Sequence, residues 1–251
     1  DKPASVSMHT IIGFEFLSTN NIIYRLEAYY KDFENLLTLK QGDFFQQNDG
    51  ELQSTPFNEF WDTDAYSYGI ELLIKKSIGR LNGWLGYTNS YSFYNIPLYG
   101  WYSPNFDRSH MLNIVGNYDL NTNFRFSTSL TFSSGNPYTP ILGRIFEWQE
   151  SKRNSFSPWY IDNNYLVGEK NISRYENYFR LDIGIDIRNI SIFKFPFDIY
   201  IQALNLTNNT NVLTYFYRTK IDRNTGDLGG VERFPVPMFP LIITGGLKFE
   251  F

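Results

Sequence analysis

Hydrophobic and polar residues alternate with a period of two along most of this chain. In FRFSTSLTFS (124–133), Phe, Thr and Leu hold the even positions, whereas Arg, Ser and Thr hold the odd ones. The same alternation runs through YFRLDIGIDIRNI (178–190) and LIITGGLKFEF (241–251). Successive side chains of a strand point to opposite faces, so each segment predicts a strand with one apolar and one polar face. No comparable segment has the i, i+3, i+4 pattern of an amphipathic helix, and we therefore predict an all-β chain.

The alternating segments predict nine strands. Their expected bounds are residues 6–17, 22–39, 66–78, 83–94, 108–120, 123–134, 177–190, 196–221 and 240–251. Several exceed ten residues, which is close to the 9–11 that a tilted strand needs to cross a bilayer and longer than the usual strand of a β-sandwich.

The predicted connections alternate between short and long. Short ones include STNN (18–21) and GRLN (79–82), whereas the long ones fall near 40–65, 95–107, 135–176 and 222–239. Short turns at one end of the strands and long loops at the other are typical of an antiparallel up-and-down transmembrane β-barrel. Aromatic residues gather near strand ends, for example Tyr66, Tyr68, Tyr91 and Phe93, as in the girdles at a lipid interface. We therefore expect the apolar face to contact lipid and the polar face to line an aqueous interior.

Composition narrows the possible functions further. Phe, Trp and Tyr make up 19% of the 251 residues, Cys is absent, and the formal net charge is −4. A disulfide framework and a thiolate metal site are therefore excluded, and nucleic acid is not an expected partner. No window holds the roughly 20 apolar residues of a membrane helix, and the start DKPASVSMHT has no signal-peptide pattern.

Four fragments resemble the carboxyl-terminal part of the barrel of TonB-dependent receptors of Gram-negative outer membranes. SGNPYTP (134–140) is similar to a strand end that opens a long external loop, and NYFRLDIGI (177–185) resembles the family's R-L-D strand. ALNLTNNTNVLTYFY (203–217) resembles its N-L-F-N segment, and PMFPLIITGGLKFEF (237–251) resembles its final strand. Their order and spacing cover most of the chain.

The resemblance implies a domain organisation. Receptors of this kind have 22 strands and an amino-terminal plug, so residues 1–251 would form a single C-terminal portion of the barrel, about its last nine strands. No part of the chain resembles the plug or the short segment that TonB binds. Nine is also an odd number, whereas bacterial single-chain barrels use even counts. We therefore expect the remaining strands and the plug in missing sequence or in another chain.

The resemblance also implies a function, namely ligand capture by extracellular loops and TonB-dependent nutrient import across the cell outer membrane. The barrel assembly machinery would bind the last strand, with Phe249 and Phe251 as the assembly signal. A scaffold barrel in a surface complex, with a surface lipoprotein as partner, stays open as an alternative. Two further alternatives are an outer-membrane barrel hydrolase and a secreted β protein that binds carbohydrate.

Aromatic residues in the long connections are the best candidates for ligand contacts, because flat rings offer a large contact area with few rotatable bonds. The alternative is that they pack the loops against one another. The candidates are Trp101, Tyr102, Phe106, Trp148, Trp159 and Tyr160.

Charged residues offer weaker candidates. Arg180, Asp182, Asp186 and Arg188 form a row on one strand face, which fits either a salt-bridge lattice of the lumen wall or a contact with plug or ligand. The chain has two histidines and no recognisable catalytic grouping, so we predict no enzyme activity. DRNTGDLGG (222–230) lacks the spacing of a calcium loop, and no metal or cofactor is predicted.

Overall fold

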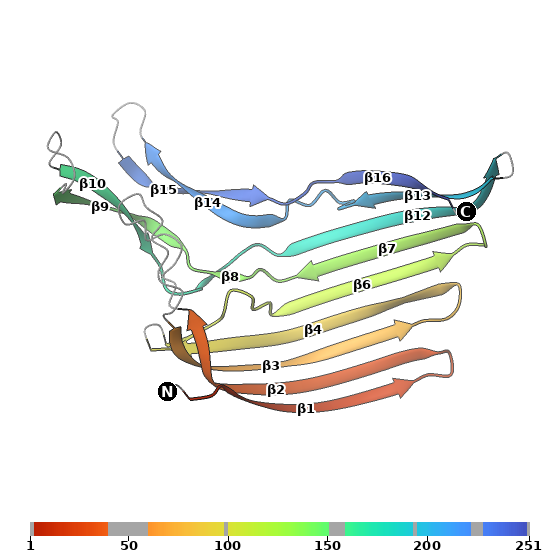
Figure 1. Ribbon diagram of the computed structural model, residues 1–251, viewed down its shortest axis with the longest axis horizontal. Coiled ribbons are helices and arrows are strands. Elements are labelled where there is room, and N and C mark those ends of the chain that lie inside the picture. The colour runs from red at the N-terminus through yellow and green to blue at the C-terminus, as the bar shows by residue number, and fades with distance from the viewer. Residues whose placement is uncertain are drawn as a thin grey trace.

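Nine long antiparallel strands form a single-layer sheet in the computed structural model, which describes residues 3–39, 60–97, 100–150, 159–192, 195–221 and 228–249 (Figure 1). All neighbouring strands are antiparallel. Neighbours in the sheet also follow one another along the chain, except where strands of the long connections (β5, β8–β11 and β14–β15) lie between them. The predicted all-β, up-and-down architecture is therefore confirmed. In sheet order the strands are β1 (Val6–Leu17), β2 (Ile22–Leu39), β3 (Phe60–Lys76), β4 (Leu81–Ile96), β6 (His110–Asp119), β7 (Phe124–Ser133), β12 (Tyr178–Ile192), β13 (Phe195–Leu204) and β16 (Ile242–Phe249).

The connections lie as the sequence predicts. The short turns at 18–21, 77–80 and 120–123 all join strands at one end of the sheet, on the right in Figure 1, and β12 and β13 also follow one another at that end. The four long connections leave from the opposite end, on the left in the same view. We call these the turn end and the loop end.

The long connections contain more regular structure than expected. Residues predicted as loops form β5 (Gly100–Tyr102), which pairs with β4, and the two-stranded pair of β8 (Pro137–Tyr138) and β11 (Ser173–Arg174). They also form a hairpin of β9 (Ile141–Glu150) and β10 (Trp159–Val167). Among the described residues no helix is long and apolar enough to span a membrane.

The prediction of a single strand over 196–221 is wrong. The structure divides it into β13 and β14 (Val212–Ile221), and β14 turns away to pair with β15 (Leu228–Pro237). Asn205 and Asn208 lie at the break with positive φ angles of 52° and 50°. Asn tolerates this left-handed conformation better than most residues, and two such residues interrupt an extended strand.

The two faces of the sheet differ in chemistry. The register places Asp119, Arg125 and Asp186 opposite one another on what we call the polar face. Tyr118, Phe126 and Ile185 lie opposite one another on the apolar face.

Within the described ranges, no second protein layer covers the apolar face. Its side chains stay open, with Ile12, Ile70 and Leu247 exposed by 75%, 52% and 56%. Among the described residues only three hydrophobic side chains are buried, those of Ala65, Ile96 and Tyr215. The sheet is therefore not one half of a sandwich, whose inner faces would be packed together.

A tyrosine and a glycine fix the position of the last strand. Tyr200 and Gly246 are direct partners between β13 and β16 on the polar face. A Cβ at Gly246 would lie 2.6–2.7 Å from the ring and hydroxyl of Tyr200, so the ring occupies the space that a side chain would need. Such a cross-strand contact opposes slippage of an edge strand.

We predict that Gly246→Ala displaces the Tyr200 ring and destabilises the pairing of β16 with β13 by about 1–3 kcal/mol, the usual cost of overpacking. The measurement is the disulfide yield between Gln202→Cys and Thr244→Cys, which are register partners. Gly230→Ala is the control, because nothing lies within 4 Å of its Cβ position. Adding Tyr200→Ala to Gly246→Ala should restore part of the yield; equal yields for both glycine variants would contradict the prediction.

Candidate functional site

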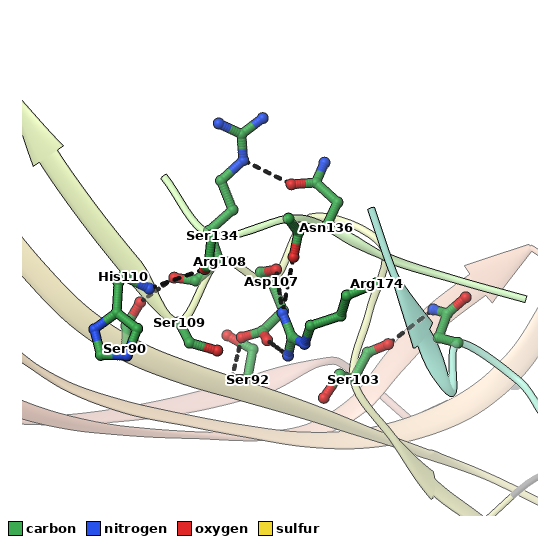
Figure 2. A network of polar contacts seen from close by, with 12 residues as sticks. Ser90, Ser92, Ser103, Asp107, Arg108, Ser109, His110, Ser134, Asn136 and Arg174 are labelled. Carbon is green, nitrogen blue, oxygen red and sulfur yellow. Dashed lines mark hydrogen bonds and ion pairs between the residues drawn. The ribbon is translucent and has the colours of Figure 1, made fainter. Parts of the chain in front are cut away.

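An ion pair between a buried carboxylate and a partly exposed arginine joins two of the long connections at the loop end. Asp107 follows β5 and its side chain is only 2% exposed, whereas Arg174 comes from β11. Arg174 Nη2 donates to Asp107 Oδ2 at 2.6 Å, and the Ser92 backbone N–H donates to Asp107 Oδ1 at 2.9 Å (Figure 2). Arg174 Nη1 also reaches the carbonyl oxygens of Asp107 and Gly135. The pair thus holds connection 97–109 against connection 134–177.

A second arginine contacts only neutral partners here. Arg108 Nε donates to Asn136 Oδ1 at 2.7 Å, and its Nη1 donates to Ser133 Oγ at 3.0 Å. In Figure 2 its guanidinium points away from the Asp107–Arg174 pair. Asn171 Nδ2 also donates to the Ser103 carbonyl at 2.8 Å, which adds a further tie between the same two connections.

Asparagines take the place of backbone partners where β13 ends. Asn205 is 3% exposed; its backbone N–H donates to Asp182 Oδ1, and its Nδ2 donates to the carbonyls of Asn209 and Phe239. Asn211 pairs with the Phe179 backbone in both directions, at 2.9 and 2.8 Å. The NLTNNTN segment therefore anchors the base of the β14–β15 hairpin to the start of β12.

The structure separates the predicted loop aromatics into different surroundings. Tyr102 and Phe106 both make edge contacts with Tyr94, at centroid distances of 6.3 and 5.8 Å. Trp101 lies opposite Asn95, on the other face of β4, and contacts Tyr66 edge-on at 5.0 Å. Tyr102 and Phe106 therefore lie together on the polar side, whereas Trp101 extends the aromatic group of the apolar face.

The other three predicted aromatics lie on the β9–β10 hairpin. Trp148 is the register partner of Ile161, Trp159 of Glu150, and Tyr160 of Gln149. Their side chains lie outside the described part of the structure, so their role as ligand contacts stays a prediction.

Three tyrosines form a cluster between connection 134–177 and the β14–β15 hairpin, which the sequence pattern does not predict. The rings of Tyr138, Tyr175 and Tyr215 lie 4.6–5.4 Å apart. Arg233 places its guanidinium 4.1 Å from the centre of the Tyr215 ring and donates from Nη1 to the Tyr138 hydroxyl at 2.6 Å. Burial raises the pKa of Tyr215, so the phenol stays neutral beside the cation. Tyr138 lies in the SGNPYTP segment, but nothing in the sequence indicates its distant partners.

The predicted row of charges lies on the polar face. Arg180 Nε donates to Asp182 Oδ1 at 2.8 Å. Near the turn end Asp119 receives two bonds from Arg125, at 2.7 and 2.9 Å, and its Oδ1 lies 3.8 Å from Arg188. Asp119, Arg125 and Arg188 thus interact across β6, β7 and β12, whereas Arg180 and Asp182 pair within β12. Whether these charges serve only the wall or also contact a plug or ligand stays a prediction.

The remaining predicted residues are placed as follows. Phe249 contacts Phe197 at a centroid distance of 5.9 Å, whereas Phe251 lies outside the described residues, so the assembly signal stays a prediction. His110 Nδ1 contacts the Tyr87 hydroxyl at 2.9 Å and the Asn89 amide at 3.2 Å, and both are neutral groups. In the described part of the chain, no three His, Asp or Glu side chains are grouped as metal ligands would be.

Comparison with known proteins shows that the sheet resembles part of a larger barrel. No family model matches the sequence, and no curated protein matches it. The ferric-catecholate import receptor Fiu of E. coli K12 is similar in structure, with a TM-score of 0.58 and 12% identity over 98% of this chain and 28% of that one. The ferripyoverdine receptor of the outer membrane of Pseudomonas aeruginosa gives a TM-score of 0.55 and 13% identity over 98% and 27%.

The chain therefore spans little more than a quarter of the length of either receptor. At this identity the likeness shows the fold, which is that of a segment of a TonB-dependent outer-membrane receptor barrel.

We predict that Arg174→Ala loosens the loop-end junction, because it leaves the buried Asp107 carboxylate without its cation. The expected cost is roughly 2–4 kcal/mol of local stability. It should appear as at least tenfold faster subtilisin cleavage in connection 134–177 on intact cells. Arg218→Ala is the control, since the exposed Arg218–Glu232 pair at 3.7 Å should contribute about 1 kcal/mol or less. Equal cleavage rates for the two variants would argue against the anchoring role.

Proposed function

We propose that residues 1–251 are the C-terminal wall of an outer-membrane receptor barrel that captures a nutrient with its loops and admits it by TonB-dependent import. The observation that carries this proposal is a single-layer sheet whose apolar face is not covered by any other described part of the chain and whose polar face carries paired charges. A sheet of this kind is stable only where the apolar face meets lipid and the other face meets water. The Gram-negative outer membrane is the expected location.

The two edges of the sheet call for further strands. β1 and β16 both run from the loop end to the turn end and both lie at an edge of the sheet. Joining them to each other would require a parallel pair, and leaving them open in lipid would leave backbone groups unsatisfied. An odd number of additional strands, with the two outermost running toward the loop end, satisfies both edges. This fits a missing wall in the same protein or in a partner, and the plug and TonB contact would lie there too.

Ligand capture is supported by the construction of the loop end. The Asp107–Arg174 pair and the Asn205–Asn211 segment fix the loop bases, while Tyr94, Tyr102 and Phe106 present rings on the polar side. Rigid bases with aromatic contacts between them suit recognition of a ligand before import. The alternative of a hydrolase needs an acid beside a histidine, and the groups that contact His110 are neutral.

The first test is fractionation of the source bacterium followed by extraction. The protein should be found with the outer membrane and should be released by detergent, but not by alkaline carbonate. Recovery in the aqueous phase without detergent would contradict the proposal and favour a secreted β protein.

A second test compares two hydroxyl residues on opposite faces of β7. Thr128 belongs to the apolar face and is the partner of Gly116 and Ile183, whereas Ser129 belongs to the polar face and lies opposite Asp182. We predict that Thr128→Lys destabilises the membrane-inserted barrel by about 2–4 kcal/mol, the cost of a lysine at the bilayer midplane. Ser129→Lys should change stability by about 1 kcal/mol or less. The measurement is the folded fraction in outer-membrane preparations, and a loss in Ser129→Lys alone would reverse the assignment of the faces.

A further inference from the structure

A histidine lies on the face of the sheet that would contact lipid. His110 and Tyr118 are both even positions of β6, so they share the apolar face, and His110 is exposed there. Ionisable side chains that face lipid are rare, because hydrocarbon offers a polar group no hydrogen-bond partner. A histidine at this position therefore needs an explanation.

The side chains of the apolar face change in type at the level of His110. Tyr118, near the turn end, is eight positions further along β6. Eight positions correspond to roughly 27 Å of strand, or about 20 Å of height for a strand tilted by about 40°. Leu112 follows His110 toward the turn end, whereas the next row toward the loop end holds the rings of Tyr68 and Tyr91, 5.6 Å apart. His110 thus lies where the aliphatic band meets the outer aromatic rows, and at that depth lipids carry the carbonyl groups that join acyl chains to the headgroup.

The hydrogen bonds of neighbouring residues determine which ring nitrogen of His110 carries the proton. Asn89 Nδ2 donates to the Ser109 carbonyl at 2.8 Å, which fixes the orientation of the amide because a carbonyl only accepts. The same Nδ2 lies 3.2 Å from His110 Nδ1, and an amide nitrogen only donates, so Nδ1 is the acceptor. The Tyr87 hydroxyl, 2.9 Å from Nδ1, is then a second donor. The imidazole is therefore neutral, with its proton on Nε2.

The Nε2–H of His110 faces away from these partners. Both groups that contact Nδ1 come from β4, and the two ring nitrogens point to different sides of the imidazole, so the Nε2–H is directed away from β4. The neighbouring positions on this face are aliphatic, namely Ile70 in the same row of register partners and Leu112 on β6. The Ser134 hydroxyl accepts from the His110 backbone N–H at 3.1 Å. Within the described residues the Nε2–H has no acceptor.

We propose that His110 is a lipid-binding residue whose Nε2–H donates to the acyl carbonyl oxygen of one outer-leaflet lipid, with Tyr87 and Asn89 as positioning residues. A neutral N–H at this depth requires a neutral acceptor that the bilayer itself supplies, and the acyl carbonyl is such a group. The phosphate of the same lipid would lie further out, at the level of the aromatic rows. This inference rests on the proposed membrane location of the sheet.

The test compares two lipids that differ only in the carbonyl group. The complete protein is delipidated in a maltoside detergent, which has no carbonyl, and titrated with diacyl phosphatidylcholine or with its dialkyl ether analogue of equal chain length. Native mass spectrometry measures the affinity for the first lipid retained. Wild type should bind the diacyl lipid about fivefold more tightly than the ether lipid, the gain of one neutral hydrogen bond. His110→Phe should remove this preference, and Asn89→Leu should reduce it because Nδ1 loses a donor.

His9→Phe is the matched control. His9 lies on the polar face of β1 and contacts Phe33 edge-on at 5.7 Å, so the same substitution there should leave the preference unchanged. Equal affinity of wild type for both lipids, or a preference that survives His110→Phe, would overturn the inference. Equal weakening of both lipids by His110→Phe would indicate the phosphate as partner and would also overturn it. None of these results bears on the outer-membrane proposal, which fractionation and extraction test separately.

Discussion

The backbone hydrogen bonds of one antiparallel sheet hold the described part of this chain together, because its side chains form almost no core. Only Ala65, Ile96 and Tyr215 are buried among the hydrophobic residues of the described part. In a globular protein the burial of apolar surface offsets the loss of chain entropy, and here that surface is left open. The sheet is therefore stable only where its apolar face meets an apolar solvent. The interior of a bilayer is such a solvent. Because it offers no hydrogen bonds to free backbone groups, it also forbids open sheet edges.

This constraint explains why the sequence predicts the sheet so well. A strand with lipid on one face and water on the other must alternate strictly, so the pattern that identifies β7 or β12 is a direct record of its two surroundings. The bounds of β1 and β2 match the expected residues, and the turn end and loop end are assigned correctly. The error at 196–221 has a local cause. Asn205 and Asn208 take left-handed conformations and so end the strand. The polar residues around them still fit an alternating pattern, so periodicity alone does not reveal the break.

The loop end could not be predicted in the same way, since its order comes from contacts between residues distant in sequence. Asp107 and Arg174 are 67 positions apart, and Arg233 and Tyr138 are 95 apart. Neither pair has a local motif. Residue type and position in a long connection alone identify the candidate aromatics, and the structure separates them: Tyr102 and Phe106 gather around Tyr94, whereas Trp101 lies on the apolar side. Residue type identifies what can bind a ligand, but the pairing register decides which face of the wall it occupies.

The ion pairs show which charges of the described residues belong to the structure itself. On the polar face, Asp119 binds Arg125 and lies near Arg188, and Arg180 binds Asp182, so these charges stabilise the wall that carries them. At the loop end Arg174 likewise pairs with the buried Asp107 carboxylate. Charges that pair in this way on the polar face and at the loop bases stabilise the positions of the strands and connections that carry them. The rings gathered around Tyr94 then stay the better candidates for ligand contacts, because they lie on the polar side next to loop bases that these ties hold in place.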